Sequence, residues 1–196
     1  MRRAALLALA AAAGCSVLHN PQGGPEADAW SAARGRWTRE GRLYDRFETH
    51  ALATATYQSP EVRRVRVEQV AAWKAMTEEE RARALAAERA EAAKGEDFLV
   101  SFFTTDARDN DLDDRHTVWR VALVLDEGEE LPSEIRTVRV DTLLKALHPF
   151  IHEYDTVYRV RFPPVAGEPL EKRHFILRIA GSEGKMDFEY RPQAGG

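Results

Sequence analysis

Cysteine and long apolar runs are both scarce in the 196 residues of this chain. Cys15 is the single cysteine, so the chain has no internal disulfide framework of the kind that stabilises small exported domains. The apolar run of residues 4–13 is ten residues long. A transmembrane helix needs about 20 apolar residues, so this run is too short to span a bilayer permanently.

Concentrated positive charge is also missing. The chain carries 28 basic and 32 acidic residues, and its formal net charge is −4. Loss of residues 1–14 would remove Arg2 and Arg3 and make the remainder more acidic. A protein that binds nucleic acid by its phosphates needs a basic stripe, and this sequence has none. We therefore exclude nucleic acid as a partner.

The common catalytic motifs are absent from the sequence. Ser182 lies in Gly-Ser-Glu-Gly, which is a hairpin-turn pattern and differs from the Gly-x-Ser-x-Gly motif of serine hydrolases. No glycine-rich phosphate loop, dinucleotide fingerprint or paired-cysteine zinc pattern is present. We expect a protein that is not an enzyme. The alternative that stays open is an envelope hydrolase with a site assembled from distant residues.

The N-terminus has the order of an export signal: Arg2 and Arg3, then the apolar run, then small residues. The segment Ala12-Ala13-Gly14-Cys15 resembles the lipobox of bacterial lipoproteins, although Leu in place of Ala12 would match better. This resemblance implies cleavage after residue 14 and acylation of Cys15, with palmitate among the chains. It also implies attachment to the cell envelope, and Ser16 is compatible with outer-membrane sorting. The alternative is a cleaved signal peptide with an incidental cysteine.

Residues 15–35 are rich in turn formers and lack a sustained hydrophobic period, so they predict a lipidated N-terminus followed by a flexible tether. The remaining residues, 36–196, are of ordinary size for one domain. Within them Trp37 is expected to pack on the domain edge.

Two periodicities predict the fold of this domain. Residues 43–57 alternate and predict a first strand. Ser59-Pro60-Glu61 and the capping box of residues 77–80 predict two helices inserted at about 59–94. Alternation then returns, with a short helical turn at 142–147 before Pro149. The later strands are expected at residues 97–105, 117–126, 134–141, 154–162, 175–179 and 186–190. The chain is therefore expected to be mainly β, as a seven-stranded antiparallel β-sandwich of immunoglobulin-like architecture with a two-helix insertion after the first strand.

The loop 106–116 is the first candidate site. Its alternating acids resemble the opening of an EF-hand loop, but Asp114 replaces the required Gly and Arg120 stands where a carboxylate should close the site. A looser Ca²⁺ site of Asp109, Asp111, Asp113 and Asp114 is one hypothesis. The other is a solvated loop balanced by neighbouring arginines.

Histidines and arginines give the remaining candidates. His148 and His152 have helical spacing, but Pro149 interrupts that helix, so packing histidines are favoured over a metal site. Arg159, Arg161 and Arg178 share the outward parity of their strands and form a candidate strip for an anionic partner. Ordinary cross-strand ion pairs with Asp187 and Glu189 are the favoured explanation of the same arginines.

Together these patterns predict a lipid-anchored cell-envelope protein that binds or assembles with an envelope partner. Trp73 and Met76, on the inserted helices, are one candidate contact surface. A calcium-dependent binding module that uses the acidic loop is the alternative from another class.

Overall fold

The computed structural model describes residues 25–45 and 48–192, and in these ranges the protein is mainly β. The predicted signal segment 1–14, the predicted lipidation site Cys15 and residues 16–24 lie outside the described residues. No helix in the described ranges is long and apolar enough to cross a bilayer.

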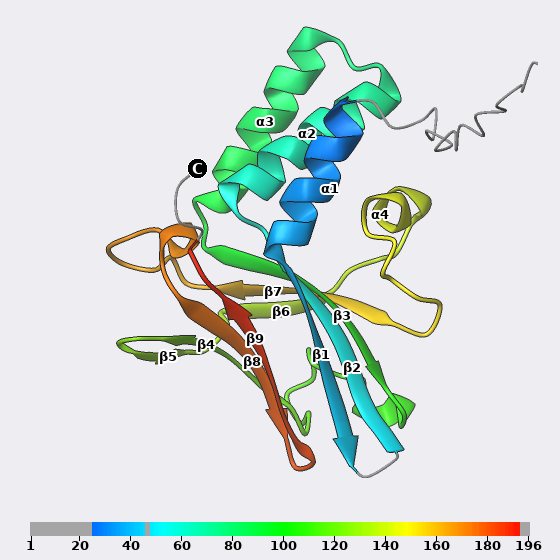
Figure 1. Ribbon diagram of the computed structural model, residues 1–196, viewed down its shortest axis with the longest axis vertical. Coiled ribbons are helices and arrows are strands. Elements are labelled where there is room, and N and C mark those ends of the chain that lie inside the picture. The colour runs from blue at the N-terminus through cyan, green and yellow to red at the C-terminus, as the bar shows by residue number, and fades with distance from the viewer. Residues whose placement is uncertain (1–24, 46–47, 193–196) are drawn as a thin grey trace, which may run out of the picture.

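The described strands form two antiparallel sheets (Figure 1). The five-stranded sheet A has the order β1-β2-β3-β7-β6, and the four-stranded sheet B has the order β5-β4-β8-β9. The strands of sheet A are β1 (Thr38–Asp45), β2 (Glu48–Tyr57), β3 (Glu96–Thr104), β6 (Glu134–Thr137) and β7 (Thr156–Phe162). Those of sheet B are β4 (Arg120–Leu125), β5 (Gly128–Glu130), β8 (Phe175–Gly181) and β9 (Gly184–Tyr190).

The core lies between the two sheets because both contribute alternating apolar residues to it. Tyr57 and Phe98 of sheet A meet Phe175 and Tyr190 of sheet B, and the Phe175 and Tyr190 rings stack with centroids 4.8 Å apart. The Tyr190 hydroxyl donates a buried hydrogen bond of 2.9 Å to the carbonyl of Ala55. This bond fixes β9 against β2.

Three helices, α1 (Pro25–Trp37), α2 (Pro60–Lys74) and α3 (Glu78–Ala92), gather at one end of the sheets (Figure 1). The predicted caps of the two inserted helices are confirmed. The Ser59 side chain accepts the amide of Val62, and Thr77 and Glu80 form a capping box. The predicted turn at 142–147 is also confirmed as α4 (Thr142–Leu147). Two 3-10 turns, η1 (Ala107–Asp109) and η2 (Leu170–Lys172), complete the described elements.

The predicted tether is wrong over its last eleven residues, 25–35. They lie in α1, where Trp30 and Ala33 are buried in the core. The Trp30 indole N–H donates to the carbonyl of Leu147 at 3.0 Å, and Trp37 is buried as well. The folded domain therefore begins at or before Pro25, and not at residue 36.

The predicted strand count is also wrong. Nine strands replace seven in the described residues for two reasons. The expected first strand is two, since β1 and β2 form a hairpin in which Leu43 pairs with Ala51, and the short strand β5 was not predicted. The helical insertion consequently follows the second strand. The order also differs from the immunoglobulin order, in which the third strand crosses to the second sheet, since β1, β2 and β3 are neighbours in sheet A.

The outer face of sheet A, away from sheet B, is divided into three zones. Near the helices, Asp97 and Arg161 are buried and bonded to α2 and α3. In the middle, Leu99 and Val157 pack with Ile151 in a small apolar cluster. The zone toward the end of β1 at Asp45 stays open and forms a groove.

Candidate functional site

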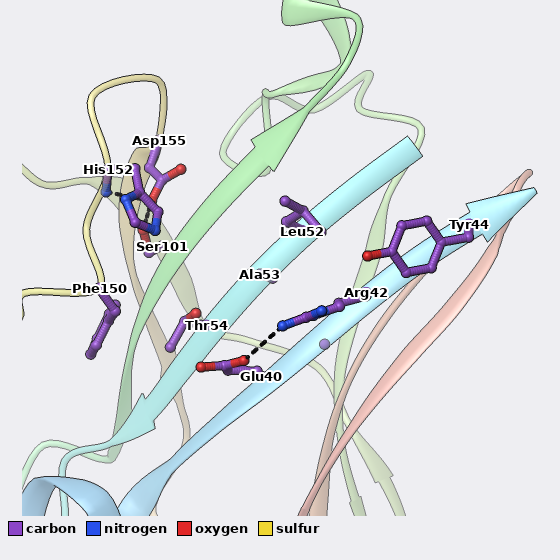
Figure 2. Close-up of a pocket in the computed structure, with 11 residues that line it drawn as sticks. Glu40, Arg42, Tyr44, Leu52, Ala53, Thr54, Ser101, Phe150, His152 and Asp155 are labelled. Atoms are coloured by element: carbon purple, nitrogen blue, oxygen red, sulfur yellow. Dashed lines mark hydrogen bonds and ion pairs between the residues drawn. The ribbon is translucent and has the colours of Figure 1, made fainter. Parts of the chain in front are cut away.

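The groove on sheet A is the candidate functional site (Figure 2). It has a volume of about 350 Å³ and is bounded by the outer faces of β1, β2 and β3 and by the loop that precedes β7. The side chains that Figure 2 labels in it are Glu40, Arg42, Tyr44, Leu52, Ala53, Thr54, Ser101, Phe150, His152 and Asp155.

Strand alternation places the wall of the groove. Gly41 and Leu43 of β1 face the core, where a Cβ on Gly41 would lie 2.7 Å from the Phe188 ring. The intervening Arg42 and Tyr44 therefore face outward. Tyr44 is 53% exposed, and the neighbouring Leu52 on β2 is also exposed. This wall presents an aromatic and an aliphatic side chain beside a guanidinium.

The charge on this wall is paired but accessible. Arg42 donates to Glu40 at 3.4 Å, and both side chains are more than half exposed. An exposed pair at this distance contributes little to stability. Both groups therefore remain available to hydrogen-bond a ligand.

A serine, a histidine and an aspartate converge at the other side of the groove. The Ser101 hydroxyl donates to Asp155 Oδ2 at 2.6 Å, and the backbone N–H of His152 donates to the same oxygen at 2.9 Å. Within the described residues the His152 imidazole forms no hydrogen bond with either partner. Ser101 is 3% exposed. The Asp155 carboxylate thus fixes the loop before β7 to β3. The Ser101 proton points to this carboxylate and not to the His152 imidazole, which a serine hydrolase would use as its general base.

Next to the groove, under α2 and α3, lies a buried network of charges. Asp97 accepts from Arg161 Nε at 2.7 Å and from Arg63 Nη2 at 2.5 Å. Burial raises the pKa of the Asp97 carboxyl, but the hydrogen bonds from Arg161 and Arg63 outweigh it, so the pKa lies below its ordinary value. Arg63 also reaches Glu88, and Arg161 reaches Glu91, both on α3. The network holds the helices on the sheet, and we assign it a structural role.

The arginines of the predicted strip do not form one surface. Arg159 and Arg161 lie on β7 of sheet A, whereas Arg178 lies on β8 of sheet B. The expectation that Arg161 is a free outward charge is wrong, because α3 covers it and it is buried beside Asp97. Arg159 pairs with Glu134 at 2.9 Å. Arg178 pairs across strands with Asp187 at 2.7 Å, which confirms the cross-strand ion pair.

The aspartates of the acidic loop bind different partners and do not converge on one point. The Asp111 carboxylate accepts from the Thr117 hydroxyl, Asp113 accepts from Thr137, and Asp114 accepts the amide of His116. Asp109 ends η1. In the described ranges no group of three or more potential metal ligands is close enough to hold an ion. The structure therefore does not bring Asp109, Asp111, Asp113 and Asp114 together as a calcium cage.

The two histidines occupy different environments, as the interrupting proline predicts. His148 is fully buried between the rings of Trp30 and Phe150, at centroid distances of 5.5 and 5.4 Å. Neither of its ring nitrogens has a hydrogen-bond partner among the described residues. Burial lowers the pKa of His148 to about 3. His152 is exposed in the groove.

Sequence reasoning missed the groove itself. Ser101 and Asp155 are 54 positions apart and belong to no short motif, so only the pairing of β3 with β7 brings them together. The alternation of residues 43–57 predicts one continuous strand, and this prediction hides the position of Tyr44 on an exposed edge strand.

Comparisons with known proteins return no relative of this chain. No protein-family model matches it, and neither the curated proteins nor the solved structures contain a match.

Proposed function

We propose that the protein is a lipid-anchored component of the bacterial cell envelope, held in the outer membrane by acylated Cys15, and that its domain binds an envelope protein in the groove without catalysis. The observation that carries the binding role is the exposed wall formed by Arg42, Tyr44 and Leu52. Tyrosine and arginine are enriched among the residues that dominate protein–protein binding energy.

The geometry favours an extended protein segment as the ligand. The groove lies across β1, β2 and β3 of sheet A and has a half-buried aromatic residue, Phe150, on the side opposite Tyr44 (Figure 2). Between them lie groups that donate and accept hydrogen bonds, Thr54 and the exposed Glu40–Arg42 pair. Such a surface binds apolar side chains at its edges and backbone amides along its floor.

Hydrolysis is the second candidate function, because Ser101, His152 and Asp155 meet in the groove. The hydrogen bond from Ser101 to the carboxylate argues against it, since the general base must take the serine proton. Replacement by Ser101→Ala tests this directly. If the wild type hydrolyses an ester or a peptide and the alanine variant does not, the groove is a catalytic site and the proposal of binding without catalysis is wrong.

The binding proposal is tested by site-specific photo-crosslinking in intact cells of the source bacterium. A photoreactive residue at Tyr44 should give one discrete crosslinked product, and Arg42→Glu should weaken it at least several-fold. The matched control is the same residue at Leu131, which is also exposed but lies outside the groove. Equal crosslinking at both positions, or none at Tyr44, would contradict the assignment of the groove.

The anchor is tested separately by fractionation. Wild-type protein should sediment with outer membranes and carry acyl mass on Cys15, while Cys15→Ala should be released. Membrane retention of Cys15→Ala after washing would refute the lipid anchor and leave the groove proposal intact.

A further inference from the structure

An exposed tryptophan lies at the tip of the helical hairpin. α2 ends at Lys74, Ala75 adopts the left-handed conformation, and α3 begins at Glu78. In the last turn of α2, Trp73 is 46% exposed, and Met76 beside it is half-buried. The other three tryptophans of the chain, Trp30, Trp37 and Trp119, are each at most 8% exposed.

This tip lies at the end of the molecule where the described chain begins. Arg36 and Trp37, at the end of α1, bind Glu61 in the first turn of α2 at 2.5 and 3.1 Å. The two helices pack together, and α1 runs back along α2. The start of α1 therefore lies toward the end of α2 that carries Trp73, as Figure 1 shows. The end of β1 at Asp45 and the start of β2 at Glu48 lie at the opposite end of the molecule.

The length of the preceding chain limits how far this end stands from an anchored Cys15. Residues 15–24 number ten, and ten residues span at most about 33–36 Å. The start of α1 must then lie within that distance of the lipid surface. The hairpin tip is thus the apolar surface that the anchor brings closest to the bilayer.

The size and charge of the tip indicate which kind of partner it contacts. One tryptophan and one methionine present far less area than the ~800 Å² per partner that a stable protein dimer buries, so a second copy does not fit the patch well. Indole rings, in contrast, favour the interface between headgroups and hydrocarbon. Lys74 and the glutamates Glu78, Glu79 and Glu80 lie at the tip, and Arg81 and Arg83 pair with Glu78 and Glu79, so the positive and negative charges there balance. Without an excess of positive charge the tip has no attraction for anionic lipid, and we therefore assign it to neutral, zwitterionic lipid.

We propose that Trp73, with Met76, inserts into the headgroup region of a zwitterionic bilayer and fixes the orientation of the anchored domain, with the helical hairpin toward the membrane. This inference rests on the proposed lipid anchor. It adds a second membrane contact to the acyl chains and holds the β1–β2 end of sheet A away from the lipid.

Fluorescence quenching by brominated lipid tests this contact. Mature protein with Cys15 as its first residue is coupled through that single thiol to a maleimide lipid in phosphatidylcholine vesicles, with or without bromine on the acyl chains. We expect brominated lipid to lower the total tryptophan fluorescence by roughly a quarter, because one of the four tryptophans contacts the lipid. Trp73→Phe should remove this quenching, because the three remaining indoles are buried. Replacing a third of the lipid by phosphatidylglycerol at low salt should not increase the quenching.

The outcomes separate this inference from the anchor. Equal emission in both kinds of vesicle, or quenching that persists in Trp73→Phe, would overturn the proposed contact, as would concentration-dependent dimerisation that Trp73→Phe abolishes. Chemical coupling makes the result independent of processing in the cell. Absence of acyl groups on protein purified from cells would refute the proposed anchor. The contact of Trp73 with the coupled vesicles would still be measured independently.

Discussion

Arg161 and Asp97 face each other across β7 and β3 and form two parallel hydrogen bonds, each 2.7 Å long. Arg63 of α2 reaches the same carboxylate, and Glu91 of α3 reaches the same guanidinium. A single sheet position thus connects both inserted helices to sheet A. The stability of the helical end depends on this carboxylate.

Asp97→Asn should destabilise the protein strongly. The substitution removes the buried carboxylate that both guanidinium groups share and leaves each with only its more exposed acidic partner on α3, Glu88 or Glu91. Breaking a buried ion pair by removal of one partner costs about 3–5 kcal/mol. Urea unfolding followed by circular dichroism measures the change in the free energy of unfolding. Glu79→Gln is the control, because Glu79 forms only an exposed pair with Arg83 at 3.9 Å and should change stability by less than ~0.5 kcal/mol. Similar decreases in the free energy of unfolding in both variants would contradict a stabilising role for the buried network.

The same carboxylate predicts a dependence on acid. The pKa of Asp97 is lower in the folded protein than in the unfolded chain, where an aspartate has a pKa of about 3.9. The unfolded state therefore takes up a proton first as the pH falls. The contribution of Asp97 is complete above about pH 4 and decreases as the pH falls through the lower folded pKa. The stability difference between wild type and Asp97→Asn should narrow below pH 4, and a difference that stays constant down to pH 2 would refute this linkage.

His148→Phe should remove a second pH dependence. The folded protein keeps this imidazole neutral because burial lowers its pKa to about 3, and the charges of Arg34 and Arg66 act in the same direction. The unfolded chain binds the proton near pH 6.5, so the wild type loses stability between about pH 6.5 and 3, amounting to ~2 kcal/mol at pH 5. Phenylalanine fills a similar space between the rings of Trp30 and Phe150 and has no nitrogen to leave unpartnered.

Unfolding at pH 7 and at pH 5 checks this prediction. The variant should be at least as stable as the wild type at pH 7 and should lose about 2 kcal/mol less on acidification. His116→Gln, at an exposed histidine, should keep the slope of the wild type. An unchanged slope in His148→Phe would show that another group titrates.

Two glycines with similar backbone angles should respond differently to alanine. Gly95 has φ +150° and Gly128 has φ +146°. A Cβ on Gly95 would lie 2.1 Å from the backbone oxygen of Phe162, whereas a Cβ on Gly128 would meet nothing within 4 Å. Both variants carry backbone strain of about 1–3 kcal/mol, and Gly95→Ala adds a steric clash. Thermal unfolding should place Gly95→Ala clearly below Gly128→Ala, and equal melting temperatures would contradict the close approach.

The starts of α2 and α3 could be predicted because their capping signals lie within a few residues of each helix. Ser59 and the Thr77–Glu80 capping box mark the helix starts because the hydrogen bonds that they form lie within a few residues. The local signals of α1 are weaker: Pro25 at its first position and Arg34 and Arg36 in its last turn. Its place is fixed by Trp30, which binds a carbonyl 117 positions away. A tether and a docked helix of this composition look alike until that distant contact is known.

The arginines and the groove likewise depend on contacts between residues far apart in the sequence. Alternation correctly placed Arg161 on the outer face of its strand, but it contains no information about the helix that covers that face. The hairpin between β1 and β2 was missed because Asp45-Arg46-Phe47 has no glycine, proline or asparagine. Without that turn, the convergence of Tyr44 with Ser101 and Asp155 was not predictable.

The direct junction of α1 with β1, in which Thr38 follows Trp37 without a loop, determines how the domain carries force. Tension on the chain before Pro25 first loads the contacts that dock α1, such as the hydrogen bond from Trp30 to Leu147, and reaches the eight-residue strand β1 only after they break. The hydrogen bonds from β1 to β2 are perpendicular to the strand, so such a pull loads them together in shear. The docked helix and the sheet edge beside the groove therefore bear tension from that end of the chain one after the other.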